Sequence, residues 1–246
     1  MVKIIAEGTN GRYTAEQLLQ IMAALRSPGG CPWDIEQTHK SIRNDALEEV
    51  YEVVDAIDND DAAALCEELG DMLLQVVFHS RIAEENGSFS FDDVVDGICK
   101  KLVLRHPHVF GEEQIETANA VLDRWESIKK EEKHQQTHTE TLKSVPKAFP
   151  ALMRAAKVQK RAGKAGVTLP NVLDDGSLAD AVAKLSEVYK SGEREEVEKA
   201  YGKVLFLSAG LQQTLGVNSE EALNLATEDY ISRFEQAEKE NQLKNF

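Results

Sequence analysis

The sequence predicts an all-α fold, and three features support this prediction. Apolar residues recur at helical spacing along nearly the whole chain. Proline is scarce, with 6 in 246 residues, and the alternation of β-branched residues that is typical of strands is hard to find. We therefore expect helices that are bundled in antiparallel pairs.

The first helix is predicted to begin at a capping box, Thr14-x-x-Gln17. Apolar residues follow it at i, i+3, i+4 and i+7: Leu18, Ile21, Met22 and Leu25. The Ser-Pro-Gly-Gly segment at 27–30 ends this helix. A loop, Cys-Pro-Trp-Asp at 31–34, then leads to a second helix over about residues 42–58.

Three more helices are predicted in the first half of the chain. One runs over residues 61–85 and ends at the Asn-Gly pair 86–87, a typical left-handed C-cap. The next begins at a capping box over 90–93 and ends before the His-Pro pair 106–107, because the residue before a proline avoids helical angles. The third covers residues 119–133.

The chain is predicted to consist of two helical domains joined by a polar linker. Apolar side chains almost disappear after Glu131, so we place the linker at 135–145. The first domain would then span residues 1–134, and the second residues 146–246, with another long helix near 197–215.

Composition excludes several classes of function. A net charge of −15 argues against binding of nucleic-acid polymers, which normally requires a basic face. No apolar run approaches the roughly 18–20 residues that span a bilayer, and the N-terminus lacks the apolar core of a signal peptide. We therefore expect a cytoplasmic protein without a membrane partner. Cys31, Cys66 and Cys99 show neither zinc-site nor disulfide spacing.

Carboxylates on two successive predicted helices mark a candidate metal site. Glu49 and Glu52 share a face of one helix, and Glu68 and Asp71 share a face of the next, where Gln75 continues the polar stripe. The second helix is otherwise apolar on nearly every side, so we expect it to be buried. Buried carboxylates need compensation, and four oxygen ligands favour Mg²⁺ or Mn²⁺. A di-iron centre is the rival use of carboxylates in a helical bundle, but it would have Glu-x-x-His on two helices. Here the residues at i+3 are Glu52 and Asp71, not histidine.

At this point the chain resembles the MazG family, whose members are all-α nucleoside triphosphate pyrophosphohydrolases. The similarity runs through about residues 14–133 and, more weakly, through 146–235. The motifs that carry it are Pro-Gly-Gly-Cys-Pro-Trp-Asp at 28–34, Glu-Glu-x-x-Glu at 48–52, Glu-Leu-Gly-Asp at 68–71 and Arg-His-Pro-His-Val-Phe at 105–110. The family usually has two arginines before His-Pro-His, whereas here the first position is Leu104.

The resemblance implies hydrolysis of nucleoside triphosphates to the monophosphate and pyrophosphate by attack of water on the α-phosphorus. It implies Mg²⁺, with Mn²⁺ as a substitute, at four carboxylates: Glu49, Glu52, Glu68 and Asp71. Glu48 is then a candidate for a second metal ion or for orienting the attacking water. The resemblance also implies homodimers, with the sites near the subunit interface.

Two pairs of residues are further candidates for nucleotide binding. Lys101 and Arg105 share one helix face at i, i+4, and Trp125 and Lys129 repeat that spacing on the next helix. The resemblance places both pairs around the nucleotide, where the cations would neutralise phosphate oxygens and the indole could stack on a base. The alternatives are solvated surface for the two lysines and core packing for Trp125.

The second half resembles a degenerate copy of the first. Residues 182–188 align with 47–53, and residues 199–203 align with 67–71. Of the four ligand positions only Glu187 keeps a carboxylate, because Lys184, Ala200 and Lys203 occupy the others. An ammonium group has no lone pair to offer a cation, so we expect this half to stabilise a dimer or bind a partner.

A competing hypothesis for the whole chain is a helical dimer that binds nucleotides or a partner for regulation without turnover. The four intact carboxylates of the first half favour the enzyme over this alternative.

Overall fold

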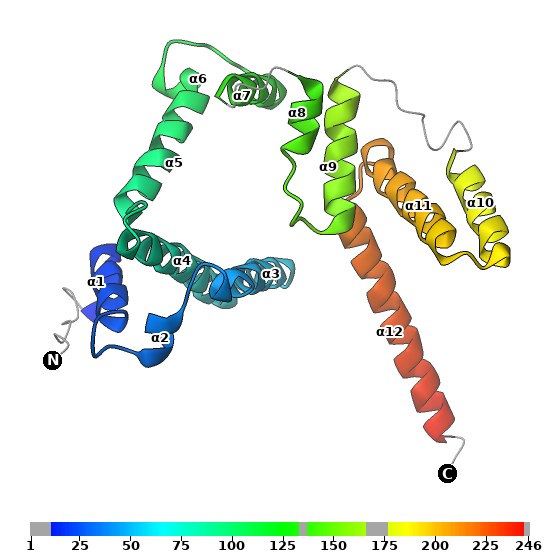
Figure 1. Cartoon of the computed structure of the whole chain (residues 1–246), viewed down its shortest axis with the longest axis horizontal. Helices are drawn as coiled ribbons and strands as arrows, with labels where there is room; N and C mark the ends of the chain where they lie inside the picture. The colour runs from blue at the N-terminus through cyan, green and yellow to red at the C-terminus, as the bar shows by residue number, and fades with distance from the viewer. Residues whose placement is uncertain (1–10, 133–136, 166–176, 244–246) are drawn as a thin grey trace. The chain divides into compact units, whose positions relative to one another are not determined.

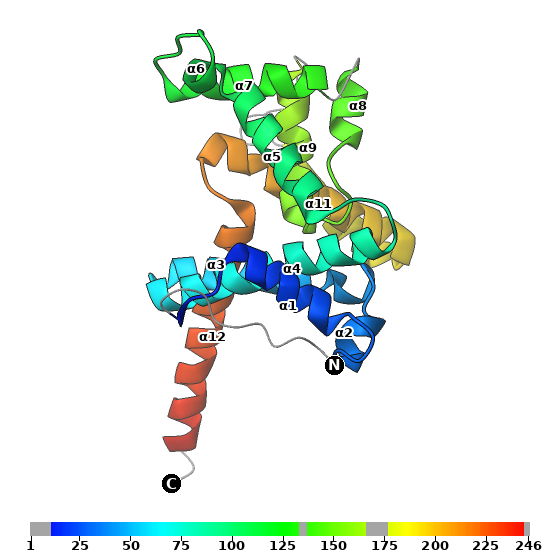
Figure 2. The same ribbon diagram turned by 90° about the vertical axis from the view of Figure 1, so that its left-hand side faces the viewer.

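The computed structural model describes residues 11–132, 137–165 and 177–243, and all regular secondary structure within these ranges is helical. The prediction of an all-α fold is therefore confirmed. The chain divides into two compact units, Met1–Ile128 and Lys129–Phe246. Figures 1 and 2 show the helices of both units. Within the described ranges, no helix combines the length and the apolar character needed to cross a membrane.

The first unit is built around a pair of helices, α3 and α4, which pack along each other (Figure 1). Helix α1 packs on α4, and α5 continues from its far end. The elements in chain order are α1 (Ala15–Leu25), α2 (Pro32–Glu36), the 3-10 helix η2 (Ser41–Arg43), α3 (Asp45–Asp58), α4 (Ala62–Glu85), α5 (Phe91–Arg105), α6 (Pro107–Phe110) and α7 (Ala118–Glu132), which crosses the boundary between the units.

Local capping explains where these helices begin and end. The Thr14 hydroxyl accepts from the Gln17 backbone at 3.3 Å, and the Gln17 side chain accepts from the Thr14 backbone at 2.9 Å. The same reciprocal arrangement joins Ser90 and Asp93 at the start of α5. Helix α4 ends where Gly87 adopts a positive φ of 67°, which glycine tolerates without steric cost. All three predicted boundaries are confirmed.

A small apolar core fixes α4 against the elements that precede it. Its buried members come from α1, η2 and α4: Met22, Ile42, Val77, Phe78 and Ile82. Leu18, Leu19, Leu74 and Phe91 pack around this cluster. The core therefore covers the C-terminal half of α4 and leaves the N-terminal half to α3.

The prediction that α4 is buried on nearly every side is wrong for the single chain. Leu69, Leu73 and Val76 expose 45%, 42% and 40% of their surface. Apolar side chains of α3 and α5 are exposed as well, and we group them with those of α4 as the exposed apolar face: Leu47, Val50, Tyr51, Val54, Ile57, Val95, Ile98, Leu102, Val103 and Leu104. The described residues of the first unit leave these side chains exposed, whereas its buried core lies among α1, η2 and α4.

The second unit repeats the order of packing seen in the first. Helices α10 and α11 pack along each other, α9 packs on α11, and α12 contacts both α9 and α11. The alignment that pairs Glu68 with Ala200 also pairs Ala62, the first residue of α4, with Arg194, the first residue of α11. The elements are α8 (His138–Lys143), α9 (Ala151–Lys164), α10 (Ser177–Ser191), α11 (Arg194–Leu215) and α12 (Ser219–Leu243).

The segment predicted as a polar linker contains helix α8. A capping box begins it, in which Thr137 and Glu140 exchange side-chain to backbone hydrogen bonds. Val145 follows and is only 1% exposed, and Arg161 of α9 donates to the Thr141 carbonyl at 2.6 Å. Residues 137–145 are therefore part of the second unit, while positions 135 and 136 of the predicted linker lie outside the described residues.

Candidate metal centre

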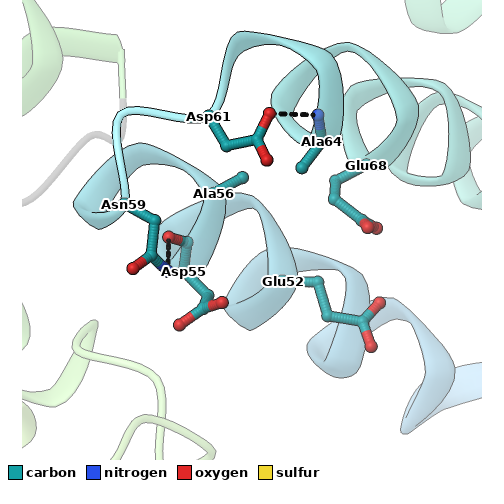
Figure 3. A pocket seen from close by; sticks show the side chains of 7 residues that line it. All are labelled: Glu52, Asp55, Ala56, Asn59, Asp61, Ala64 and Glu68. Carbon is teal, nitrogen blue, oxygen red and sulfur yellow. Dashed lines mark hydrogen bonds between the residues drawn. The ribbon is translucent and has the colours of Figure 1, made fainter.

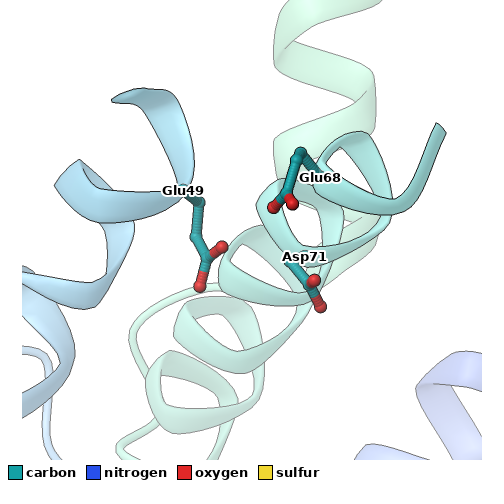
Figure 4. Close-up of side chains that lie close together, drawn as sticks. All are labelled: Glu49, Glu68 and Asp71. Atoms are coloured by element: carbon teal, nitrogen blue, oxygen red, sulfur yellow. The ribbon is translucent and has the colours of Figure 1, made fainter. Parts of the chain in front are cut away.

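Three carboxylates from α3 and α4 meet where the two helices face each other. Glu49 on α3 and Glu68 and Asp71 on α4 each offer one oxygen, and these oxygens all lie within 4.8 Å of one another (Figure 4). All three residues are half-buried. The i, i+3 spacing puts Glu68 and Asp71 on one face of α4, and the packing of α3 on α4 brings Glu49 to that face.

The other two predicted acidic residues lie on α3 outside this group of three. Glu52 is exposed and lines an open hollow of about 260 Å³ beside the cluster (Figure 3). The hollow is otherwise bounded by Asp55, Ala56, Asn59, Asp61, Ala64 and Glu68. Glu48 is exposed as well. Glu52 thus lies next to the site, because it lines the same hollow as Glu68. Glu48 belongs neither to the group of three nor to the lining of this hollow.

The carboxylates of the cluster repel one another, and this repulsion helps to raise the pKa values of Glu49 and Glu68. Partial burial raises the pKa of Glu49, and the negative charges of Asp71 and Glu52 raise it further, against a hydrogen bond from Gln75 that lowers it. Desolvation also raises the pKa of Glu68, followed by the charges of Glu52 and Asp71. Carboxylates that repel one another in this way favour protonation or a bound cation.

The donor set fits a hard divalent cation. The three ligand atoms are carboxylate oxygens, and oxygen-only sets suit Mg²⁺ or Mn²⁺ better than zinc or copper. The adjoining Gln75 is 9% exposed, and its Oε1 atom is buried without a hydrogen-bond partner among the described residues. An unpaired buried acceptor beside repelling carboxylates is consistent with a site for a hydrated cation.

The predicted nucleotide-binding residues lie on α5 and α7. Lys101 is exposed and Arg105 half-buried near the end of α5, which leads away from α4 toward α6 and α7 (Figure 1). The Trp125 ring packs edge-on against His106, with 5.2 Å between ring centroids. Lys129 is half-buried in α7, beyond the boundary of the first unit. The groups that shift the pKa values of Glu49 and Glu68 are neighbouring carboxylates and, for Glu49, Gln75; Lys101 and Arg105 are not among them.

Arg26 fixes the loop between α1 and α3, a role that the sequence did not reveal. Its side chain is 6% exposed and binds Glu85 of α4 at 2.7 Å. It also donates to the carbonyls of Asp34 and Gln37. This loop carries Trp33, which is 58% exposed. The sequence signal for this role is weak, because it consists only of the position of Arg26 directly before the Ser-Pro-Gly-Gly segment that ends α1.

Two histidines join the same loop to α4. The Nδ1 atoms of His39 and His79 are 2.9 Å apart, and the rings are nearly parallel, at 11°. Burial lowers the pKa of His79, and the neighbouring His39 lowers it further. The surroundings of His79 therefore favour its neutral imidazole.

The counterpart of the acidic cluster in the second unit contains an ion pair. The Lys184 Nζ atom lies 2.9 Å from Glu187 Oε2 on the exposed side of α10. Glu187 is the carboxylate that survives in the alignment, so a lysine side chain already neutralises it.

Comparisons with known proteins cover most of the chain. A family model described as the MazG nucleotide pyrophosphohydrolase domain matches residues 37–110, which include the acidic cluster, Lys101 and Arg105. A nucleoside triphosphate pyrophosphohydrolase of Escherichia coli (strain K12) is 42% identical over 231 residues, which cover 91% of this chain and 87% of the relative.

A second relative is similar over almost the same span. The Thermotoga maritima protein named nucleoside triphosphate pyrophosphohydrolase/pyrophosphatase MazG is 37% identical over 223 residues, which cover 91% of this chain and 85% of that protein. The uncharacterised protein YabN of Bacillus subtilis is 41% identical over 216 residues, which are 87% of this chain and 44% of YabN. These similarities extend well beyond residues 37–110 into the second unit.

Proposed function

Because this chain belongs to the MazG family of nucleotide pyrophosphohydrolases, we propose that it hydrolyses nucleoside triphosphates to the monophosphate and pyrophosphate, with Mg²⁺ as cofactor. The observation that carries this proposal is the meeting of Glu49, Glu68 and Asp71 within 4.8 Å, inside the segment that the family model matches. The curated relatives named nucleoside triphosphate pyrophosphohydrolases support the same substrate class.

The three clustered carboxylates would hold the cation, and Glu52 would join them from the adjoining hollow. When bound, a divalent cation offsets charge on phosphate oxygens and lowers the pKa of a coordinated water. Glu48 would act at the rim, for a second ion or for the attacking water. The reaction that we propose is attack of this water on the α-phosphorus, with pyrophosphate as the leaving group.

Lys101 and Arg105 would neutralise the triphosphate, and Trp125 and Lys129 would complete the nucleotide site. Since neither Lys101 nor Arg105 is among the groups that shift the pKa values of Glu49 and Glu68 in the single chain, we assign this completion to a homodimer. The exposed apolar face of α3, α4 and α5 supports the dimer, because apolar surface of this extent usually marks a protein interface. Its distribution over three helices of the first unit suits an interface between copies of this chain.

The second unit would be a degenerate copy of the first that serves dimer stabilisation or partner binding. The repeated packing order of α9 to α12 supports the repeat. The ion pair of Lys184 with Glu187 supports the loss of metal binding, because the lysine ammonium occupies the place of a cation. Exposed apolar residues persist here too, among them Tyr201, Leu205 and Phe206.

Product analysis tests the proposed reaction. Each NTP and dNTP is incubated with the full chain and Mg²⁺, and monophosphate plus pyrophosphate are separated from diphosphate plus phosphate. We expect the first pair in equal amounts, lost in Glu68→Ala and retained in Glu187→Ala, the matched control in the second unit. Formation of diphosphate would contradict the reaction, and tight nucleotide binding without products would favour the non-catalytic dimer.

A further inference from the structure

Gln75 lies one helical turn beyond Asp71 on α4, and its two amide atoms have different surroundings. The side chain is 9% exposed. Its Nε2 atom donates to Glu49 Oε1 at 3.4 Å, across the contact between α3 and α4. Its Oε1 atom is buried and has no hydrogen-bond donor among the described residues.

The orientation of this amide follows from the chemistry of its partner. An ionised carboxylate, as in a site that binds a cation, can only accept hydrogen bonds, so the amide nitrogen of Gln75 faces Glu49. The amide oxygen is therefore not the atom that contacts Glu49, and both of its lone pairs remain available to accept hydrogen bonds. The hydrogen bond to Glu49 is long, as such contacts often are before a ligand binds.

A purely structural residue would not be expected to leave this oxygen unpaired. Burial of an amide oxygen without a donor destabilises the folded state, whereas an apolar side chain of the same shape would avoid that cost. Among the described residues, the two other polar residues that are buried as a whole do have partners. Gln159, 6% exposed, donates to the Phe206 carbonyl at 2.7 Å, and Ser80, 2% exposed, donates to the Val76 carbonyl at 2.8 Å.

We propose that Gln75 is a positioning residue of the metal centre: its amide nitrogen holds the carboxylate of Glu49, and its amide oxygen accepts a hydrogen bond from a water bound to the cation. This inference rests on the proposed function. A cation-bound water is a strong donor, and a neutral amide oxygen orients it without taking up its proton. The unpaired oxygen of the metal-free protein thus gains its partner only when the site is loaded.

The test compares Gln75→Met with a matched control, Gln159→Met, in the full-length chain. Both changes replace a buried glutamine by an apolar side chain of similar length. Mn²⁺ affinity is measured by isothermal titration, the Tm of the metal-free protein by calorimetry, and kcat and KM with a dNTP. For Gln75→Met we expect Mn²⁺ affinity and kcat to fall by about 10–100-fold, as for other outer ligand-supporting residues. The nucleotide KM should change less, and the metal-free Tm should be unchanged or higher.

The control is expected to behave in the opposite way. Gln159→Met should lower the Tm, because it removes a hydrogen bond between α9 and α11, and should leave Mn²⁺ affinity unchanged. The proposal is overturned if Gln75→Met keeps Mn²⁺ affinity and kcat within about twofold of the unmodified protein. It is also overturned if that variant lowers the Tm without changing Mn²⁺ affinity, since Gln75 would then only join α3 to α4.

The same measurements separate this inference from the proposed function. If the unmodified chain neither binds Mn²⁺ nor hydrolyses dNTPs, both ideas fail. If it does both and Gln75→Met does so equally well, only the role of Gln75 is refuted.

Discussion

Replacement of Glu68 by glutamine should weaken cation binding sharply while preserving the fold. The change keeps the shape of the side chain but removes one of three carboxylates whose oxygens lie within 4.8 Å of one another. Loss of an outer residue that only supports a ligand typically costs 10–100-fold in metal affinity, so we expect loss of a direct ligand to cost about 100-fold or more. Turnover with Mg²⁺ should fall with it.

The expected size of the effect on thermal stability can be calculated. At a Mn²⁺ concentration about 100 times its Kd, binding stabilises the folded protein by about 2.7 kcal/mol. With an affinity about 100-fold weaker, the same concentration gives only about 0.4 kcal/mol. In a protein of this size 1 kcal/mol corresponds to about 2–4 °C, so the rise in Tm on adding Mn²⁺ should shrink by about 5–9 °C.

Glu67→Gln is the matched control, because Glu67 is exposed, adjacent on α4 and outside the cluster. It should keep the full rise in Tm with Mn²⁺ and nearly full turnover. Calorimetry with and without Mn²⁺ measures both variants. The metal-free Glu68→Gln protein should be at least as stable as the unmodified one, since a repelling charge has gone. A full Mn²⁺ response and unchanged turnover in Glu68→Gln would refute the proposed site.

Three further predictions concern the histidine pair, the cations of α5 and the exposed apolar face. Burial and His39 lower the pKa of His79 from its ordinary 6.5, so its contribution to stability is complete above that value and is lost as the pH falls through the depressed pKa. His79→Gln should remove this pH-dependent part of the free energy of unfolding, which is measured by urea unfolding between about pH 5 and 8. A pH profile that is the same in the variant and the unmodified protein would contradict this prediction. Lys101→Ala and Arg105→Ala should each raise the KM for a triphosphate by about tenfold, the usual size of a charged hydrogen bond, with little change in Mn²⁺ affinity by titration; unaltered kinetics would make both residues plain surface charge. Ile57→Asp, at a position 52% exposed in the single chain, should convert a dimer to a monomer in sedimentation velocity, and a dimer of undiminished stability would exclude this face as the interface.

The sequence predicts best those features that depend on neighbouring residues. The capping boxes at Thr14 and Ser90 and the positive φ of Gly87 are set within one helical turn, and each lies where the spacing predicts it. The box that begins α8 follows the same rule at Thr137. The surrounding segment is so polar that its composition predicts a linker instead.

The candidate site could be predicted only in part, because it combines local and non-local geometry. Helical spacing alone places Glu68 and Asp71 on one face of α4. The spacing cannot show that the packing of α3 brings Glu49, and not Glu52, into the group of three. Contacts such as that of Arg26 with Glu85 join residues far apart in sequence, and no periodic pattern indicates them.

The apolar pattern of α4 also has a limit as a predictor. Residues such as Leu69 and Leu73 indicate that the helix requires cover on several sides, but the pattern does not say whether the same chain supplies it. The described part of the first unit covers one side only, and the exposed remainder is what leads us to propose a second copy.

The position of bond cleavage tests the central claim most directly. A dNTP is hydrolysed by the full-length chain with Mg²⁺ in water enriched in oxygen-18, and the products are separated and examined by mass spectrometry. If water attacks the α-phosphorus, one labelled oxygen appears in the nucleoside monophosphate and the pyrophosphate stays unlabelled. Label in the pyrophosphate, or release of inorganic phosphate with a nucleoside diphosphate, would contradict the reaction proposed for this site.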